Sequence, residues 1–119
     1  MAKEIKEIVT KEDTFDTLEI RLGRVVSVEK VENTPKPAYK MKVDFGKFGI
    51  KSSIGRFTHH KPEEIKDRLV LGVLNFEPRT IGDSISEVLI LGVQFPKAES
   101  GEATFITPAL QAKVGSKLF

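Results

Sequence analysis

Apolar and polar side chains alternate along residues 18–31, which is the pattern of a β-strand with one buried face. The alternation is interrupted at Gly23 and Arg24, where a residue without a Cβ allows a bulge or a sharp bend. The pattern therefore predicts one long, bent strand that pairs with neighbours on two sides, as in small, partly open Greek-key barrels. The apolar residues of the expected buried face are Leu18, Ile20, Leu22, Val26 and Val28.

Further apolar or alternating runs predict the other strands. They lie at residues 39–45, 50–54, 69–76 and 86–93, with residues 103–106 pairing back on the last of them. The run 39–45 alternates most clearly, because apolar side chains occupy every second position and lysines occupy two of the positions between them. No internal repeat, low-complexity tract or linker is evident in the chain. We therefore expect an all-β domain built on a five-stranded Greek-key barrel.

Only short helices are predicted. Ile5, Ile8 and Val9 stand at helical spacing, which predicts an amphipathic helix over residues 3–10. One such stripe cannot stabilise an isolated helix in water, so this helix must pack on the barrel or on another subunit. A brief helical turn is expected before the first strand, and a short linking helix is expected to begin at Pro62, a residue suited to the first helical position.

The composition limits the possible classes of protein. A length of 119 residues is typical of a single domain with its own core. The chain contains no cysteine, which excludes disulfides, thiol catalysis and cysteine-bound metal centres, and which suits a reducing cytoplasm. No apolar run approaches the roughly 20 residues that a membrane-spanning helix needs. These features predict a cytoplasmic protein that does not insert into a membrane.

Positive charge is concentrated in the middle of the chain. Residues 36–61 contain seven Lys and Arg against Asp44 alone, a local net charge of +6, whereas the whole chain carries only +2. Such an excess attracts a polyanion such as nucleic acid. A charged, solvated sheet face that prevents edge pairing would give the same pattern, so both interpretations stay open.

Seven short motifs, taken in order, resemble a known family. Their order and spacing are similar to the tRNA-binding domain of the OB-fold type, and most closely to its CsaA branch, which is described as an export-related chaperone. The motifs are residues 16–23 (DTLEIRLG), 36–40 (KPAYK), 43–46 (VDFG), 50–53 (IKSS), 62–65 (PEEI), 75–79 (NFEPR) and 86–92 (SEVLILG).

The resemblance covers residues 13–119 and implies a five-stranded OB-fold barrel that forms a homodimer through its terminal elements. Residues 1–12 are then an amphipathic extension, expected to form the dimer contact together with Leu118 and Phe119. The resemblance implies a binding module without catalytic activity or cofactor. Its expected partners are tRNA, recognised by shape and charge, unfolded preproteins, and the export machinery. A chaperone with only incidental RNA affinity is the alternative.

One departure from the family pattern bears on the ligand. Members that bind tRNA more tightly have Gly-Met where this chain has Val88-Leu89. Glycine permits close approach of a backbone and methionine offers an adaptable surface, so two branched residues weaken the tRNA interpretation and favour the peptide interpretation. The CsaA branch shows the same substitution.

Basic and hydroxyl side chains of the expected outer surface are candidates for contacts with phosphate and sugar oxygens. Arg79 has a second interpretation, which we favour, in which it braces the turn after Pro78. Arg21 is expected in a cross-strand ion pair. The nucleic-acid candidates are Lys40, Lys42, Lys47, Lys51, Ser52, Ser53, Arg56, Arg79 and Ser86.

A chaperone needs exposed apolar side chains that form a groove for extended segments. Each candidate for such a groove has a core interpretation, which we favour for Phe76 and Leu89. Tyr39 and Phe57 are also candidates for stacking on bases, although the alternation of residues 39–45 favours a core position for Tyr39. The peptide-binding candidates are Phe48, Ile54, Phe57, Phe76 and Leu89.

Catalytic and metal-binding motifs are weak in this sequence. His59 and His60 are adjacent, so their side chains point apart, and no third ligand stands at a suitable spacing. Ser52 and Ser53 lack a nucleophile-elbow motif and an evident His–Asp partner. The sequence therefore predicts neither a metal site nor an enzyme.

Overall fold

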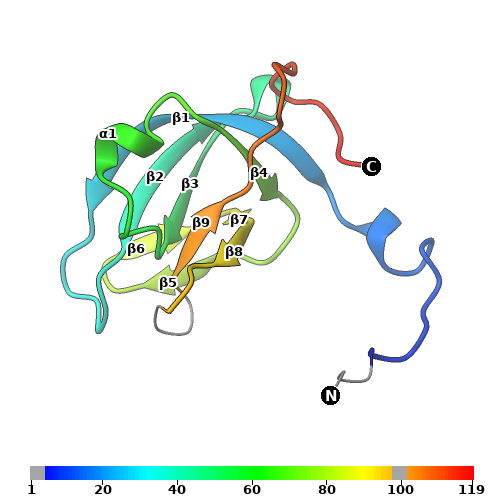
Figure 1. Cartoon of the computed structure of the whole chain (residues 1–119), viewed down its shortest axis with the longest axis horizontal. Helices are drawn as coiled ribbons and strands as arrows, with labels where there is room; N and C mark the ends of the chain where they lie inside the picture. Colours follow the sequence, from blue (N-terminus) through cyan, green and yellow to red (C-terminus); the bar gives the residue numbers. More distant parts are fainter. Residues whose placement is uncertain (1–4, 98–101) are drawn as a thin grey trace.

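A computed structural model describes residues 5–97 and 102–119, in which five antiparallel strands form a nearly closed barrel (Figure 1). The main sheet has the order β3-β2-β1-β4-β7, and two hairpins, β5–β6 and β8–β9, lie against it. The strands are β1 (Ile20–Lys30), β2 (Tyr39–Asp44), β3 (Ile50–Gly55), β4 (Leu69–Val73), β5 (Arg79–Ile81), β6 (Ser84–Ser86), β7 (Leu89–Ile90), β8 (Gly92–Gln94) and β9 (Ala103–Phe105). The helices are η1 (Phe15–Thr17), η2 (Gly46–Phe48) and α1 (Pro62–Ile65).

Strand β1 organises the barrel as predicted, because its first half pairs with β4 and its second half with β2. The register irregularity is not at Gly23, as we expected, but between Val25 and Ser27. Val25 is buried in the core, whereas Val26 lies at the irregularity and is exposed. The predicted buried face is therefore wrong at Val26, since an extra residue in a strand reverses the side chains that follow it.

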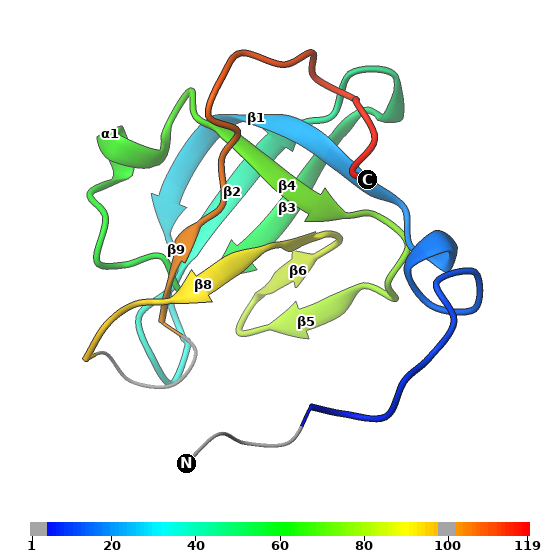
Figure 2. The ribbon, with the colours of Figure 1, turned by 45° about the vertical axis from the view of Figure 1, so that its right-hand side comes forward.

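The C-terminal segment lies along the edge of β1 that β2 does not reach (Figure 2). Leu22 N–H donates to Ser116 O at 2.9 Å, and Leu118 N–H donates to Ile20 O at 3.1 Å. Ile20 and Leu22 are buried beneath this part of the molecule. The expected irregular tail is thus an added edge segment, which supplies partners for backbone groups that would otherwise be unpaired.

The core is centred on β2, whose alternation is confirmed. Tyr39, Met41 and Val43 are buried, as is Phe45 directly after the strand. Tyr39 O–H donates to the His60 carbonyl oxygen at 2.8 Å, so this side chain braces the loop after β3 and is not free to stack on a base.

The barrel closes where β3 meets residues 85–88. Glu87 N–H donates to Ser52 O at 2.8 Å, and Ile54 N–H donates to Ser86 Oγ at 3.0 Å. The sequence predicted one strand over residues 86–93, but the chain instead forms the end of β6, a turn, and the short strands β7 and β8. The β5–β6 hairpin was not predicted, because three-residue strands carry too short an alternation to be recognised.

Two further expectations concern helices. The helix at Pro62 is confirmed as α1, in which Glu64 Oε1 accepts a hydrogen bond from Lys61 N–H at 2.6 Å and Ile65 is buried. The amphipathic helix over residues 3–10 is wrong in its described part, since residues 5–10 form no helix and their apolar side chains are exposed. A single apolar stripe without a packing surface does not hold a helix in one protomer. Residues 3 and 4 lie outside the described residues.

Within residues 5–97 and 102–119, no helix has the length and apolar character needed to cross a membrane.

Candidate nucleic-acid interface

Four lysines lie on consecutive elements of the barrel, and we call this set the basic face. It consists of Lys40 and Lys42 on β2, Lys47 in η2 and Lys51 on β3. Lys40 and Lys42 alternate with the buried side chains of β2 and therefore point outward, and their cross-strand partners on β3 are Ile54 and Ser52. Lys51 lies opposite the buried Val43 and shares the parity of Ser53, but its charge, like that of Lys40, acts on Glu87.

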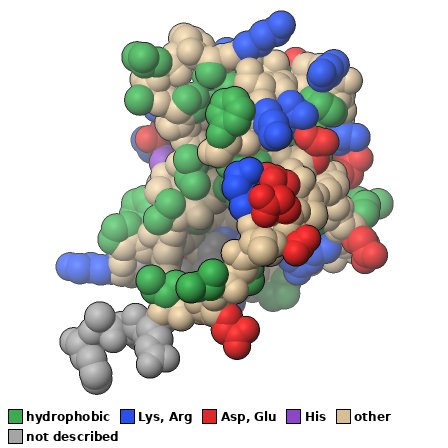
Figure 3. Space-filling view, turned by 90° about the vertical axis from the view of Figure 1, so that its right-hand side faces the viewer, with side chains coloured by type: hydrophobic (Ala, Val, Ile, Leu, Met, Phe, Trp, Pro, Cys, Tyr) green, Lys and Arg blue, Asp and Glu red, His purple; other side chains and the backbone are tan. Residues whose placement is uncertain are grey.

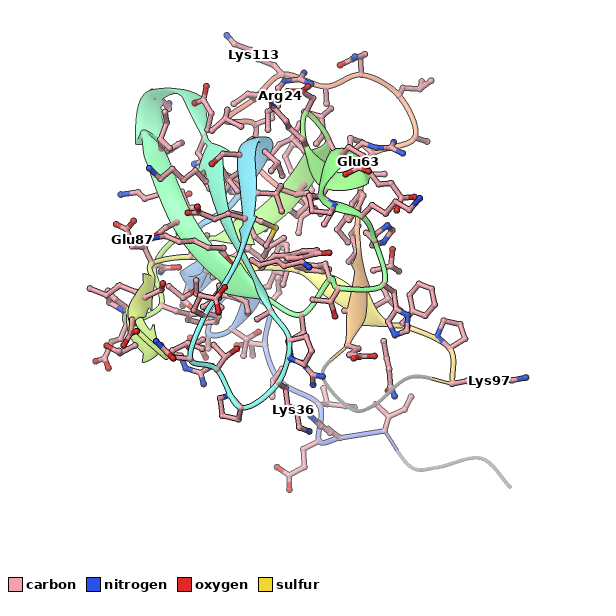
Figure 4. The ribbon with its side chains drawn as sticks, turned by 90° about the vertical axis from the view of Figure 1, so that its left-hand side faces the viewer. Arg24, Lys36, Glu63, Glu87, Lys97 and Lys113 are labelled. Carbon is pink, nitrogen blue, oxygen red and sulfur yellow. The ribbon has the colours of Figure 1, made fainter. Side chains whose placement is uncertain are left out.

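One carboxylate lies within the basic face. Glu87 Oε1 accepts hydrogen bonds from the Ser52 backbone N–H and from the Ser52 hydroxyl, both at 3.0 Å. These two bonds lower the pKa of Glu87, the positive charges of Lys51 and Lys40 lower it further, and partial burial opposes them. Figure 4 shows Glu87 at one side of the molecule, far from Lys97.

The predicted serines are buried in the barrel or hydrogen-bonded within it. Ser53 is only 2% exposed, so the expectation that its hydroxyl meets RNA is wrong, because its parity on β3 faces the core beside Met41. The Ser52 hydroxyl also lies 2.9 Å from Ile85 O, and Ser86 Oγ donates to Val88 O at 3.3 Å. Ser52 and Ser86 are therefore engaged in closing the barrel.

An apolar groove lies between β3, the β5–β6 hairpin and β7. Two hollows of about 560 and about 260 Å³ share Ile54, Arg79, Ile81 and Leu89 in their walls, and Phe76 lines the smaller one. Figure 3 shows exposed apolar side chains around a hollow on one face of the molecule. Four of the predicted peptide-binding residues line these hollows, namely Ile54, Phe57, Phe76 and Leu89.

The burial of the aromatic candidates differs from our expectation. Phe76 and Leu89, for which we favoured the core, are 46% and 47% exposed. Phe57, for which both a groove and a core position were open, is 3% exposed and forms part of the core, where it packs edge-on against Phe105. Phe48 lies away from the groove, with the Arg21 guanidinium 4.7 Å from its ring centroid.

The interactions of two arginines differ from those expected. Arg21 pairs with Glu19 of its own segment at 2.7 Å, and it forms no cross-strand ion pair with any residue that the structure describes. Arg79 is exposed and lies opposite Ser86 in the β5–β6 hairpin. Among the described residues it makes no hydrogen bond to a loop carbonyl, so the favoured bracing role is not observed.

The family model named for a tRNA-binding domain matches residues 20–117. This chain belongs to the tRNA-binding domain family. Structures similar to this tRNA-binding domain include the CsaA chaperone proteins of Picrophilus torridus (33% identical, TM-score 0.83) and Bacillus anthracis (32% identical, TM-score 0.85). They align with 94% and 95% of this chain, respectively, and with the whole of each solved chain.

A longer relative of the tRNA-binding domain is the methionine–tRNA ligase of Pyrococcus abyssi, which is 32% identical over 98% of this chain. The match covers only 15% of the ligase. The domain therefore corresponds to a small part of that protein. The likeness to CsaA structures confirms the predicted family and its nearly closed, five-stranded barrel.

Arg56 lies apart from the basic face of the tRNA-binding domain. Its guanidinium is 3.2 Å from Glu102 Oε1, and His59 Nε2 lies 2.5 Å from Glu102 Oε2. The His59 ring stacks on Phe95 with centroids 4.4 Å apart. This cluster ties the loop after β3 to the β8–β9 hairpin. In the part of the chain that the structure describes, no three His, Asp or Glu side chains are grouped to hold a metal ion.

Sequence reasoning missed two residues of these surfaces. Glu87 was not singled out, because it is an ordinary charged residue in a predicted strand and its partner Ser52 is 35 positions away. Ile81 lies in the unpredicted hairpin and lines both hollows of the groove. The signal in the sequence was Gly82 itself, because glycine favours a turn, and in the structure its φ is +60°.

Proposed function

We propose that this tRNA-binding domain binds tRNA through the basic face, as a cytoplasmic binding module without catalytic activity. The observation that carries the proposal is the gathering of Lys40, Lys42, Lys47 and Lys51 on β2, η2 and β3. Ammonium groups on neighbouring strands can neutralise several phosphates of one RNA backbone. Membership of the tRNA-binding domain family supports the choice of tRNA among polyanions.

Recognition is proposed to depend on the shape and charge of the RNA. The lysines donate to phosphate oxygens in any sequence, whereas the nearby hydroxyls of Ser52 and Ser86 are already hydrogen-bonded within the barrel. Tyr39 and Phe57 are buried and offer no stacking surface. Structured RNA with closely spaced phosphates is therefore the expected ligand class, without base-specific contacts.

A salt titration tests this proposal. If the four lysines meet four phosphates, raising the salt from about 50 to about 200 mM is expected to weaken tRNA binding by about 50- to 150-fold. Fluorescence anisotropy with labelled tRNA measures the change. A DNA duplex of similar charge serves as the comparison ligand. A change of less than about 3-fold would exclude binding through the basic face.

A second function, capture of unfolded preproteins, is favoured by the apolar groove. Ile54, Phe76 and Leu89 present apolar surface between β3 and the β5–β6 hairpin, where an extended segment can lie. The similarity to CsaA chaperone structures supports this candidate. In this proposal the domain hands its client to the export machinery. A chaperone with incidental RNA affinity would need only this groove.

Replacing Leu89 by Asn is expected to weaken the binding of an unfolded, apolar peptide by about 10-fold, because burial of a Leu side chain contributes about 1.5–3 kcal/mol. The matched control is Leu110→Asn, since Leu110 is also exposed but lies outside the groove. Isothermal calorimetry with a permanently unfolded peptide measures both. Equal losses in the two variants would argue against the groove as the peptide site.

We further propose that residues 1–12 and the C-terminal residues form the contact of a homodimer. Ile5 and Ile8 are fully exposed in the single chain, as is Phe119, and burial in a partner surface would remove them from water. A chain that contains only residues 13–119 is expected to sediment as a monomer, whereas the full chain sediments as a dimer. A truncated chain that still forms the dimer would remove the extension from this role.

A further inference from the structure

The carboxylate of Glu87 lies in an arrangement suited to any oxyanion. It receives the Ser52 backbone N–H and the Ser52 hydroxyl, and it feels the positive charges of Lys40 and Lys51. A phosphate oxygen requires the same partners, namely an N–H group, an O–H group and nearby ammonium groups. The basic face therefore contains an anion subsite that this protein fills with its own side chain.

We propose that Ser52, Lys40 and Lys51 form a phosphate subsite for RNA, and that Glu87 occupies it in the free protein and is displaced when a phosphate binds. This inference rests on the proposed tRNA-binding function and names both a specific contact and an autoinhibitory device. Glu87 acts as an internal competitor that reduces the affinity of the basic face for polyanions.

The backbone geometry allows Glu87 to leave without opening the barrel. The Glu87 backbone N–H donates to Ser52 O at 2.8 Å, and the Val88 N–H donates to the same oxygen at 3.3 Å. These bonds hold residues 87 and 88 on β3 whether or not the carboxylate is present. Glu87 is also exposed, so its side chain can rotate into solvent. Release therefore requires only side-chain torsions and the loss of two hydrogen bonds to Ser52.

The Ser52 hydroxyl has an alternative partner in both states. It lies 2.9 Å from Ile85 O and 3.0 Å from Glu87 Oε1. When Glu87 leaves, the hydroxyl can turn to the incoming phosphate or remain on Ile85 O. The Ser52 backbone N–H has no such alternative, because its direction is fixed by β3. That N–H is the fixed part of the subsite and the best place to observe it.

The test compares Glu87→Ala with Glu29→Ala. Glu29 is exposed and lies opposite Lys40 across β1 and β2, so both variants remove one carboxylate near the same lysine. Glu87→Ala removes the competitor and is expected to raise tRNA affinity by about 10-fold. Glu29→Ala removes an exposed, screened charge and is expected to raise it by less than about 2-fold. Equal gains in the two variants overturn the proposal.

A second readout does not depend on tRNA. Inorganic phosphate is expected to shift the Ser52 amide resonance in ¹⁵N spectra of Glu87→Ala at concentrations that leave the same resonance unchanged in Glu29→Ala. An unchanged Ser52 resonance in both variants overturns the subsite. If phosphate shifts Ser52 while tRNA fails to bind any variant, the subsite stands and the proposed tRNA function fails.

Glu87→Gln tests the same proposal in case Glu87→Ala does not fold. Glutamine keeps an oxygen that accepts the Ser52 hydrogen bonds but carries no charge, so the barrel closure is preserved. Its tRNA affinity is expected to lie between those of the natural protein and Glu87→Ala, and above that of Glu29→Gln. An affinity no higher than that of Glu29→Gln contradicts internal competition.

Discussion

Reversing the charges of Lys40 and Lys42 together (K40E/K42E) is expected to lower tRNA affinity by about 10²- to 10⁴-fold. Hydrogen bonds to charged groups contribute about 1.5–3 kcal/mol each, and two such contacts are lost. Both side chains point outward from β2, so the buried side chains of the strand are unaffected. Fluorescence anisotropy at fixed low salt measures the loss, and the slope of affinity against salt is expected to fall by about two.

The matched control is K66E/K97E. Lys66 follows α1 and Lys97 lies in the β8–β9 loop, both exposed and outside β2, η2 and β3, so the net charge changes equally at a distant surface. Only the long-range potential is altered in the control, and it is screened within about 10 Å at ordinary ionic strength. We expect a loss of less than about 5-fold. Similar losses in the two variants would show that tRNA responds to total charge and not to the basic face.

The alternation of β2 made the basic face predictable. Tyr39, Met41 and Val43 fix which parity of the strand is buried, and Lys40 and Lys42 must then point outward. The roles of Ser52 and Ser86 were not predictable in the same way, because their hydrogen-bond partners come from segments more than 30 positions away. A local pattern specifies which face a residue occupies, but not which distant group meets it there.

The groove illustrates the same limit. Phe57 follows β3, Phe76 follows β4 and Leu89 begins β7, and nothing in their neighbourhood in the sequence separates them. Phe57 is covered in part by Phe105 of β9, whereas Phe76 and Leu89 line the hollow beside the β5–β6 hairpin. Their exposure follows from how the barrel closes. The position of the register change in β1 depended similarly on pairing with two strands at once.

Replacing Phe45 by Ala is expected to destabilise the domain by about 3–5 kcal/mol. The side chain is 0% exposed and fills the space over two glycines of the neighbouring strands β1 and β4. A typical domain is stable by about 5–15 kcal/mol, so the loss is a large share of the total. Urea denaturation measures it. Leu110→Ala is the control, because Leu110 is 84% exposed and its loss should change stability by no more than about 0.5 kcal/mol.

The fit between Phe45 and Gly72 explains why a strand tolerates glycine at that position. A Cβ at Gly72 would lie 2.7 Å from Phe45 Cζ, so Gly72→Ala is expected to destabilise the barrel by about 1–3 kcal/mol. In a Phe45→Leu background this contact is absent, while the contact of 2.8 Å with Val88 Cγ2 remains, so part of that penalty should disappear. A Cβ at Gly92 would meet Phe57 and not Phe45, so Gly92→Ala should cost the same in both backgrounds. If the costs of Phe45→Leu and Gly72→Ala simply add in the double variant, glycine is required at position 72 for a reason other than contact with Phe45.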